Sequence, residues 1–152
     1  MSATEAPREP IDPRQYYETL VEASPTAIVA CDPALTVMSW NPAAERLFGY
    51  RHEEAIGRHI DELVSKHESI RAEAESVSAR VFSEPIHLVT RRTRNDGSLV
   101  DVVIRSVPIM IDGRLVGAFA MFEDVGELVR QRRFFESLVE TSPPRSSWWT
   151  RA

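Results

Sequence analysis

The chain has 152 residues, of which 43% are hydrophobic and 27% are charged, and its formal net charge is −5. This length allows one domain with a real core plus tails, and the composition is that of a soluble globular protein. The acidic balance argues against a general binder of nucleic acid or of anionic membranes. One cysteine, Cys31, excludes a disulfide framework and a zinc cage.

The sequence contains no run of 18 apolar residues and no signal-peptide pattern. We therefore expect a cytoplasmic protein without a membrane partner. Lys66 is the only lysine, whereas arginine is abundant. Arginine codons are GC-rich and lysine codons are AT-rich, so this bias indicates a GC-rich genome and favours a bacterial source.

The N-terminal part predicts an arm, a helix and a hairpin. Residues 1–14 are proline-rich with mixed charges and are expected to be a disordered arm. A short helix is predicted over 15–23, ended by Pro25. Residues 27–31 are apolar, and residues 36–40 alternate between apolar and polar side chains. The turn-forming sequence Asp32-Pro33-Ala34-Leu35 lies between them, which predicts a β-hairpin.

Helical signals follow the hairpin. Asn41-Pro42 is typical of a helix start, with Asn as the cap and Pro at the first helical position, and Gly49 ends this helix. Residues 52–56 predict one more helical turn, ended by Gly57. A longer polar helix is predicted over 69–82.

The remainder predicts a three-strand meander and a last helix. The strands are expected at 86–90, 100–110 and 115–122, separated by the turn sequences Asn95-Asp96-Gly97-Ser98 and Asp112-Gly113. Asp124 then caps a helix over 126–139. Two strands, a helical insert and three more strands indicate an α+β domain with one antiparallel sheet.

A phrase of the chain occurs twice. Tyr-Glu-Thr-Leu-Val-Glu-Ala-Ser-Pro at 17–25 returns as Phe-Glu-Ser-Leu-Val-Glu-Thr-Ser-Pro at 135–143. The period of a whole domain predicts that a second copy of the domain starts here. Read two bases out of frame, the codons of Trp148-Trp149-Thr150 must encode Leu, Met or Val, then Val, then Asp at the position that corresponds to Asp32. With TCN serine and CGN arginine codons, two more apolar residues precede them. We therefore expect an out-of-frame tail, and a natural tail is the alternative.

Several spaced motifs resemble one family. The block from Trp40 to Tyr50, followed by Glu53-Glu54-Ala55-Ile56-Gly57, resembles the S1 box of PAS sensory domains. The S2 box is similar to residues 95–98, 107–109 and 112–117. The resemblance implies a PAS domain over 15–126, followed by an exit helix and the start of a second PAS repeat over 127–143. It also implies a five-stranded antiparallel sheet in the order 2-1-5-4-3, with helices on one face.

The resemblance implies a ligand cleft beneath these helices, and its ligand stays open. Trp40 and Phe48 are the candidates to flank a non-covalent ligand such as a flavin, although core packing explains both more simply. Haem-binding members of the family use a histidine on the long helix, and the matching stretch 72–82 has none. His59 and His67 lie outside it. We expect no haem, with these two histidines exposed.

Other candidate sites favour structural interpretations. The reactive-cysteine motif of flavin photosensors is absent, so we expect no covalent flavin and a buried thiol at Cys31. His87 is expected to be exposed. The cluster Arg91, Arg92 and Arg94 is expected to be a solvated face rather than a phosphate or nucleic-acid site. No catalytic or metal-binding motif is present, which predicts that the chain is not an enzyme.

Asp124-Val125-Gly126 resembles the Asp-Ile-Thr signature at the end of PAS domains, with Gly126 in place of Thr. Asp124 and Gly126 are therefore the expected signal-relay residues. The apolar positions of the exit helix predict a short coiled-coil seam and a homodimer; they are Val125, Leu128, Phe135, Leu138 and Val139. The alternative is a helix that lies on its own sheet.

These features lead to a non-catalytic sensory or interaction module of signal transduction. In the first hypothesis, a small ligand in the cleft shifts the exit helix between two orientations. In the second, the domain binds no ligand and serves as a dimerisation and linker module, with or without a signalling partner protein. A third is a truncated product of a larger multi-PAS protein with no function of its own.

Overall fold

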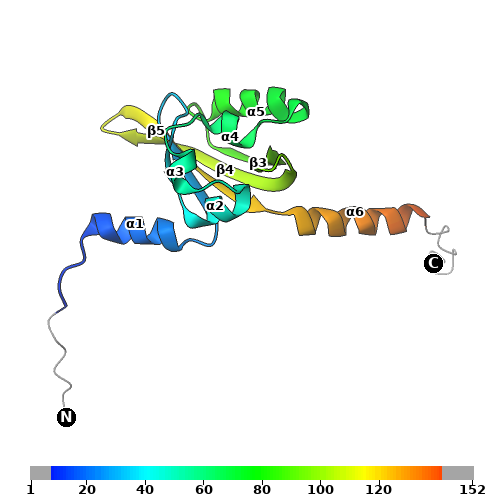
Figure 1. Cartoon of the computed structure of the whole chain (residues 1–152), viewed down its shortest axis with the longest axis horizontal. Helices are drawn as coiled ribbons and strands as arrows, with labels where there is room; N and C mark the ends of the chain where they lie inside the picture. The colour runs from blue at the N-terminus through cyan, green and yellow to red at the C-terminus, as the bar shows by residue number, and fades with distance from the viewer. Residues whose placement is uncertain (1–7, 142–152) are drawn as a thin grey trace, which may run out of the picture.

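A computed structural model describes residues 8–141 of the chain. Five antiparallel strands form one sheet in the order β2-β1-β5-β4-β3, as expected. Four helices, α2 to α5, pack over one face of this sheet, whereas α1 and α6 extend away from opposite ends of the domain (Figure 1). The domain therefore has two layers and two protruding helices.

The strands are β1 Ala27–Cys31, β2 Val37–Trp40, β3 Ile86–Thr93, β4 Leu99–Ile111 and β5 Arg114–Asp124. The helices are α1 Pro13–Ala23, α2 Pro42–Phe48, α3 His52–Ala55, α4 Ile60–Val64, α5 Glu68–Arg80 and α6 Gly126–Thr141. The sequence predicted all five strands, but β3, β4 and β5 are longer than predicted because pairing extends to the turns. The long helix predicted over 69–82 corresponds to α5, whereas α4 was not predicted as a helix of its own.

Helix α1 begins two residues earlier than predicted. The side chain of Asp12 accepts a hydrogen bond from the Arg14 N–H at 2.9 Å, and Pro13 occupies the first helical turn. Residues 13–14, expected in the disordered arm, are therefore helical. Residues 8–12 have no regular structure, and 1–7 lie outside the described part.

An aromatic cluster lies between the sheet and α2. The rings of Trp40 and Phe48 are 5.5 Å apart, and those of Phe48 and Phe122 are 5.2 Å apart. The Trp40 indole N–H donates to the Tyr50 carbonyl at 3.1 Å, so its polar atom is satisfied in the core. Trp40 is 1% exposed and Phe48 is fully buried. The packing expected across the sheet is confirmed.

Turn and cap geometry follow the sequence. Asn41 caps α2 through its side-chain oxygen, and Gly49 ends that helix with a φ of 79°, a left-handed conformation that favours glycine. Asp112 and Gly113 both have positive φ, as a tight hairpin turn requires. Gly117 permits close strand packing, because a Cβ there would collide with the Cys31 carbonyl oxygen.

Helix α6 does not lie on the sheet. Leu128, Phe134, Phe135 and Val139 are each 60–67% exposed. Figure 1 shows the helix projecting away from the strands. The alternative in which α6 covers its own sheet is therefore wrong.

Both copies of the repeated phrase are helical as far as the structure describes them. Residues 17–23 lie in α1, and residues 135–141 lie in α6. Pro143 and the expected out-of-frame tail 144–152 lie outside the described residues. The second domain therefore stays a prediction.

Candidate functional site

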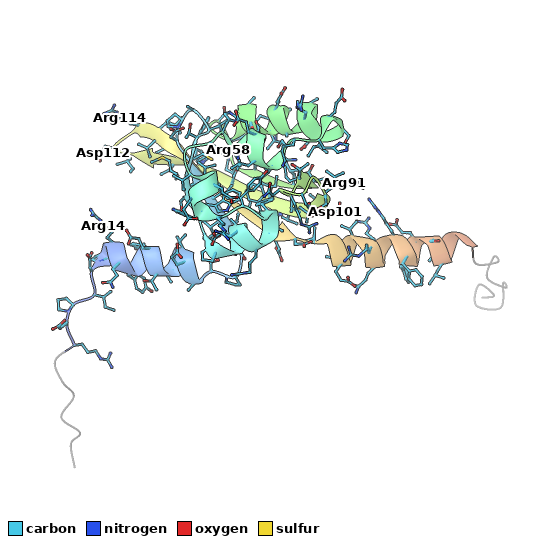
Figure 2. The ribbon with its side chains drawn as sticks, in the orientation of Figure 1. Arg14, Arg58, Arg91, Asp101, Asp112 and Arg114 are labelled. Carbon is cyan, nitrogen blue, oxygen red and sulfur yellow. The ribbon has the colours of Figure 1, made fainter. Side chains whose placement is uncertain are left out.

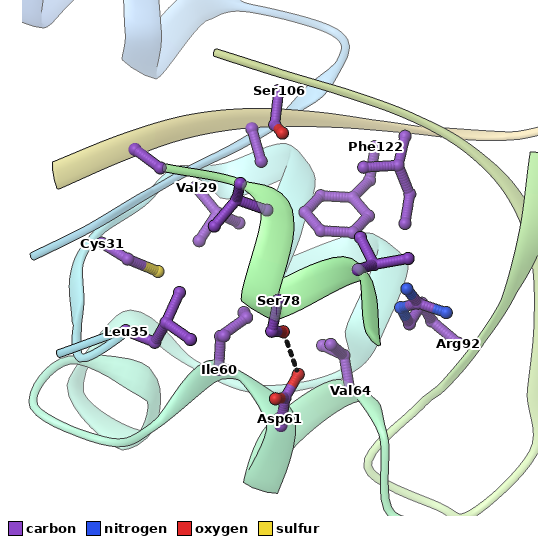
Figure 3. Close-up of a pocket in the computed structure, with 15 residues that line it drawn as sticks. Val29, Cys31, Leu35, Ile60, Asp61, Val64, Ser78, Arg92, Ser106 and Phe122 are labelled. Atoms are coloured by element: carbon purple, nitrogen blue, oxygen red, sulfur yellow. Dashed lines mark hydrogen bonds between the residues drawn. The ribbon is translucent and has the colours of Figure 1, made fainter. Parts of the chain in front are cut away.

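A cavity of about 50 Å³ lies between the sheet and helices α4 and α5 (Figure 3). Alternate residues of the central strands form its floor: Val29, Cys31, Ile104, Ala118, Ala120 and Phe122. Apolar residues of the helical layer form the opposite wall: Ile60, Val64, Val77 and Val81. The period-two alternation of strands brings one face of β1, β4 and β5 to the cavity. Its lining is therefore mostly aliphatic.

Four residues add polar groups to this lining. The Ser78 hydroxyl donates to the Asp61 carboxylate at 3.0 Å, which joins α5 to α4. Ser106 is 3% exposed, and its hydroxyl has no hydrogen-bond partner within the described residues. Arg92 reaches the cavity from β3.

Arg92 is not part of a solvated face, in contrast to the prediction. It is 3% exposed, and its Nη1 lies 2.7 Å from the Glu73 carboxylate of α5. Strand alternation turns Arg92 inward together with Ile86, while Arg91 points outward and pairs with Asp101 on β4 at 3.4 Å (Figure 2). The three arginines therefore do not form one basic cluster.

Cys31 is a buried thiol, as predicted. Burial raises the pKa of this thiol to about 12, and the negative charges of Asp32 and Asp61 add to the effect. Cys31 is therefore neutral at physiological pH and contributes no charge to the cavity. A neutral buried thiol is also a poor nucleophile.

Trp40 and Phe48, the predicted cleft residues, do not line this cavity. Phe48 instead packs edge-to-face against Phe122, which does line it. Ser106 lines the cavity although the sequence motifs did not predict it as a site residue. The signal was present, since Ser106 follows Val102 and Ile104 at a period of two and so shares their inward face.

No histidine lines this cavity among the residues described. His67 is exposed, as predicted, and its Nδ1 accepts the Ser69 N–H at 3.2 Å at the start of α5. His59 is half-buried rather than exposed, and its backbone forms a bridge with Thr36. It caps α4 in the same way, accepting the Asp61 N–H at 3.2 Å. His87 is exposed on β3, as predicted.

The C-terminal junction, Asp124–Gly126, links β5 to α6. The Asp124 carboxylate accepts the Gly126 N–H at 2.8 Å, and its other oxygen lies 3.6 Å from Arg94. Arg94 also donates to the Leu47 carbonyl of α2 at 3.2 Å. The Val125 N–H donates to the Asp101 carbonyl of β4 at 2.9 Å. The expected relay residues therefore meet α2, β4 and β5 at one point.

The family is shown by comparison with known proteins. The model of the PAS fold matches residues 15–125. The chain belongs to the PAS family. This PAS domain is 40% identical over 109 residues to the oxygen sensor protein DosP of Escherichia coli K12, and 27% identical over 126 residues to a probable C4-dicarboxylate sensor kinase of Halalkalibacterium halodurans.

These alignments cover 68% and 79% of this chain, but only 13% and 21% of the two relatives. The chain therefore spans less than a quarter of the curated relatives it matches. It is homologous to sensor proteins, and PAS is a sensory fold that is generally non-catalytic.

Solved PAS structures share the fold. The PAS domain of a Colwellia psychrerythraea protein is 25% identical with a TM-score of 0.65, and the match covers 76% of this chain and 99% of that one. That of Bordetella pertussis BvgS is 22% identical with a TM-score of 0.62, covering 85% of this chain and 98% of that one. An RNA-binding light-oxygen-voltage receptor is 23% identical with a TM-score of 0.69, and the match covers 92% of this chain and 42% of that one.

Within residues 8–141, no helix is both long and apolar enough to cross a bilayer. No group of three or more metal-ligating side chains is present in that range.

Proposed function

We propose that this PAS domain is a non-catalytic sensory module in which a small ligand in the cavity changes the orientation of α6. One observation carries the proposal: β5 both lines the cavity and leads into α6. Ala118, Ala120 and Phe122 face the cavity, and Asp124, two residues further, begins the C-terminal junction. A ligand that displaces Phe122 therefore acts on the strand that holds the junction.

Packed interiors transmit such a displacement because they have few voids to absorb it. Phe122 touches Phe48 at the end of α2, and the carbonyl of the preceding residue, Leu47, binds Arg94. Arg94 in turn pairs with Asp124. Two routes, along β5 and through α2, thus connect the cavity to the start of α6. A population shift between two α6 orientations is the expected response.

Distance measurements between spin labels test this coupling. Labels at Arg46→Cys on α2 and Arg133→Cys on α6 occupy exposed positions, and the buried, protonated Cys31 should stay unlabelled. Filling the cavity with Ala120→Val should shift the distance distribution. Ala30→Val adds the same two methyl groups to β1, outside the cavity lining, and should leave the distribution unchanged.

Xenon gas gives a second arm that needs no cavity mutation, because xenon occupies apolar cavities. Pressurised xenon should shift the distribution of the doubly labelled protein in the same direction as Ala120→Val. A folded Ala120→Val protein and a xenon-loaded protein that both keep the parent distribution would overturn the proposal.

A second candidate function is a homodimeric linker module without a ligand. Leu128, Phe135 and Val139 share a face of α6 at spacings of seven and four residues, and all three are exposed. Monomeric proteins rarely expose such a stripe. A second copy of this helix, and so a homodimer, is its proposed occupant.

Sedimentation at tens of micromolar should show a dimer. Leu128→Asp with Phe135→Asp should weaken it at least about tenfold, since burial of each side chain stabilises by about 1.5–3 kcal/mol. The control Gln131→Asp places one charge beside the stripe. A monomeric parent protein, or a control variant whose dimer is weakened as much as that of the double variant, would rule out the homodimeric linker function.

The absence of haem and of covalent flavin stays a prediction for this domain. An absorption spectrum of the purified protein, recorded before and after haem reconstitution, checks it. We expect no Soret band. A stoichiometric band that disappears in His67→Ala would contradict the expectation.

A further inference from the structure

We propose that the cavity binds a small neutral organic molecule with one polar atom, such as an alcohol or a ketone of about four non-hydrogen atoms, through the Ser106 hydroxyl. This inference deepens the proposed function and rests on it for the role of the site. It depends on three observations: an unpartnered buried hydroxyl, the size of the cavity and the charges of its lining.

The Ser106 hydroxyl is the first observation. Figure 3 shows it pointing from β4 toward the cavity, on the wall opposite Asp61. Among the residues described, the buried side-chain oxygens without a partner are those of Ser65 and Ser106, and only Ser106 lines the cavity. Buried hydroxyls normally have a partner, because an unsatisfied one is costly. A ligand atom that accepts or donates one hydrogen bond would satisfy it.

The second observation is size. A volume of about 50 Å³ holds roughly three to five water-sized groups, since one water needs about 10–15 Å³. The neighbours of Ser106 across the sheet are Ile86 and Ala120, which offer apolar side chains. A buried water requires two to four polar partners, so this corner suits water poorly. An apolar body with one polar atom matches the surroundings better.

Charge is the third observation. Arg92 is the cation of the lining, and its charge is compensated by Glu73 at 2.7 Å. Asp61 adds a negative charge, and Cys31 is neutral. An anionic ligand would therefore enter an apolar cavity without a free counter-charge, which is strongly unfavourable. A cation would be drawn to Asp61 on the other wall and would leave Ser106 unsatisfied. A neutral ligand has neither disadvantage.

Amide chemical shifts measured by NMR test the ligand class with probes of equal size. Propan-2-ol, acetone, acetate and propan-2-amine each have four non-hydrogen atoms, and at neutral pH they are neutral, neutral, anionic and cationic. We expect saturable shifts of amides in β4, β5 and α5 with propan-2-ol and acetone. Acetate should give none at the same concentrations, and propan-2-amine should bind more weakly, with shifts near Asp61 in α4 rather than in β4. Tighter binding of either ion, or no saturable shift with the neutral probes, overturns the inference.

Two serine variants test the contact. Ser106→Ala should weaken propan-2-ol binding about fivefold, the effect of one neutral hydrogen bond. Ser65→Ala removes the other unpartnered buried hydroxyl, away from the cavity, and should leave the affinity unchanged. Equal affinities in the two variants would overturn the role of Ser106. If the cavity saturates but the amides of α6 do not shift, the ligand class stands and the proposed signal relay fails.

Discussion

The two ends of the domain are held in different ways. At the N-terminal junction, residues 24–26 between α1 and β1, one fully buried amide makes four hydrogen bonds. Asn41 accepts from the N–H groups of Ile28 and Ala44 at 2.9 Å and donates to the carbonyls of Val21 and Thr26 at 3.0 Å. This single side chain ties α1, β1 and α2 together.

The C-terminal junction relies on exposed groups. The side chain of Asp124 is 49% exposed and that of Arg94 is 35% exposed, with 3.6 Å between their charged atoms. Such a pair contributes little to stability because water screens it. The domain therefore holds its first helix through a buried network and its last helix through contacts that exchange easily with water. This difference suits α6, and not α1, for an output that must move.

The largest expected effect concerns the core beneath the N-terminal junction. Trp40→Ala should lower the free energy of unfolding by about 3–5 kcal/mol, because a large aromatic side chain leaves a cavity among Phe48 and Tyr50. Urea denaturation measures it. Phe134→Ala, on the exposed face of α6, should change stability by less than about 0.5 kcal/mol. Similar losses in both variants would contradict the placement of Trp40.

Asn41→Ala should remove about 2–4 kcal/mol from the free energy of unfolding. The substitution leaves the Ile28 and Ala44 N–H groups buried without a partner, and each unsatisfied group costs about 1–3 kcal/mol. Asn95→Ala is the matched control, since that exposed amide makes one hydrogen bond to Gly49. If the two asparagine variants lose equal stability, the contrast between the junctions fails.

Asp124→Ala should cost only about 0.5–1 kcal/mol, the range for a helix cap and an exposed ion pair. Its effect on α6 should be larger than its effect on stability, because the Gly126 N–H loses its acceptor and Arg94 loses its ion pair across the junction. Spin-label distances between α2 and α6 should broaden. An unchanged distribution would mean that the backbone bond from Val125 to Asp101 alone orients the helix.

Gly126→Ala should raise stability by at most about 1 kcal/mol, the difference in helix propensity between these residues. An added Cβ would lie 3.1 Å from Asp124 Oδ1 and 3.5 Å from Arg130 Nη1, and both are ends of side chains that can move. Thermal unfolding measures the gain. Loss of stability instead would show that the close contact with Asp124 outweighs helix propensity.

Much of the local structure followed from short-range chemistry. Asn41-Pro42 and Gly49 predicted the ends of α2, and Asp112-Gly113 predicted a hairpin, since caps and turns depend on a few neighbouring residues. The PAS motifs predicted the order of the sheet. The long polar helix was predicted to within two residues at each end, whereas the five-residue helix α4 was missed because it has no strong cap residue.

The candidate site was decided by tertiary packing. Arg92 looks like part of an exposed basic run in the sequence, yet strand alternation turns it inward and Glu73, 19 residues earlier, compensates its charge. In the sequence, Ser106 is one hydroxyl on the inward face of an alternating strand, and its burial without a hydrogen-bond partner among the described residues is seen only in the folded domain. The sequence alone determined the family and the layer in which each strand face lies, because period and turn residues are local. Which buried polar atoms are left without a hydrogen-bond partner depends on contacts between distant segments, and only the tertiary structure decided that.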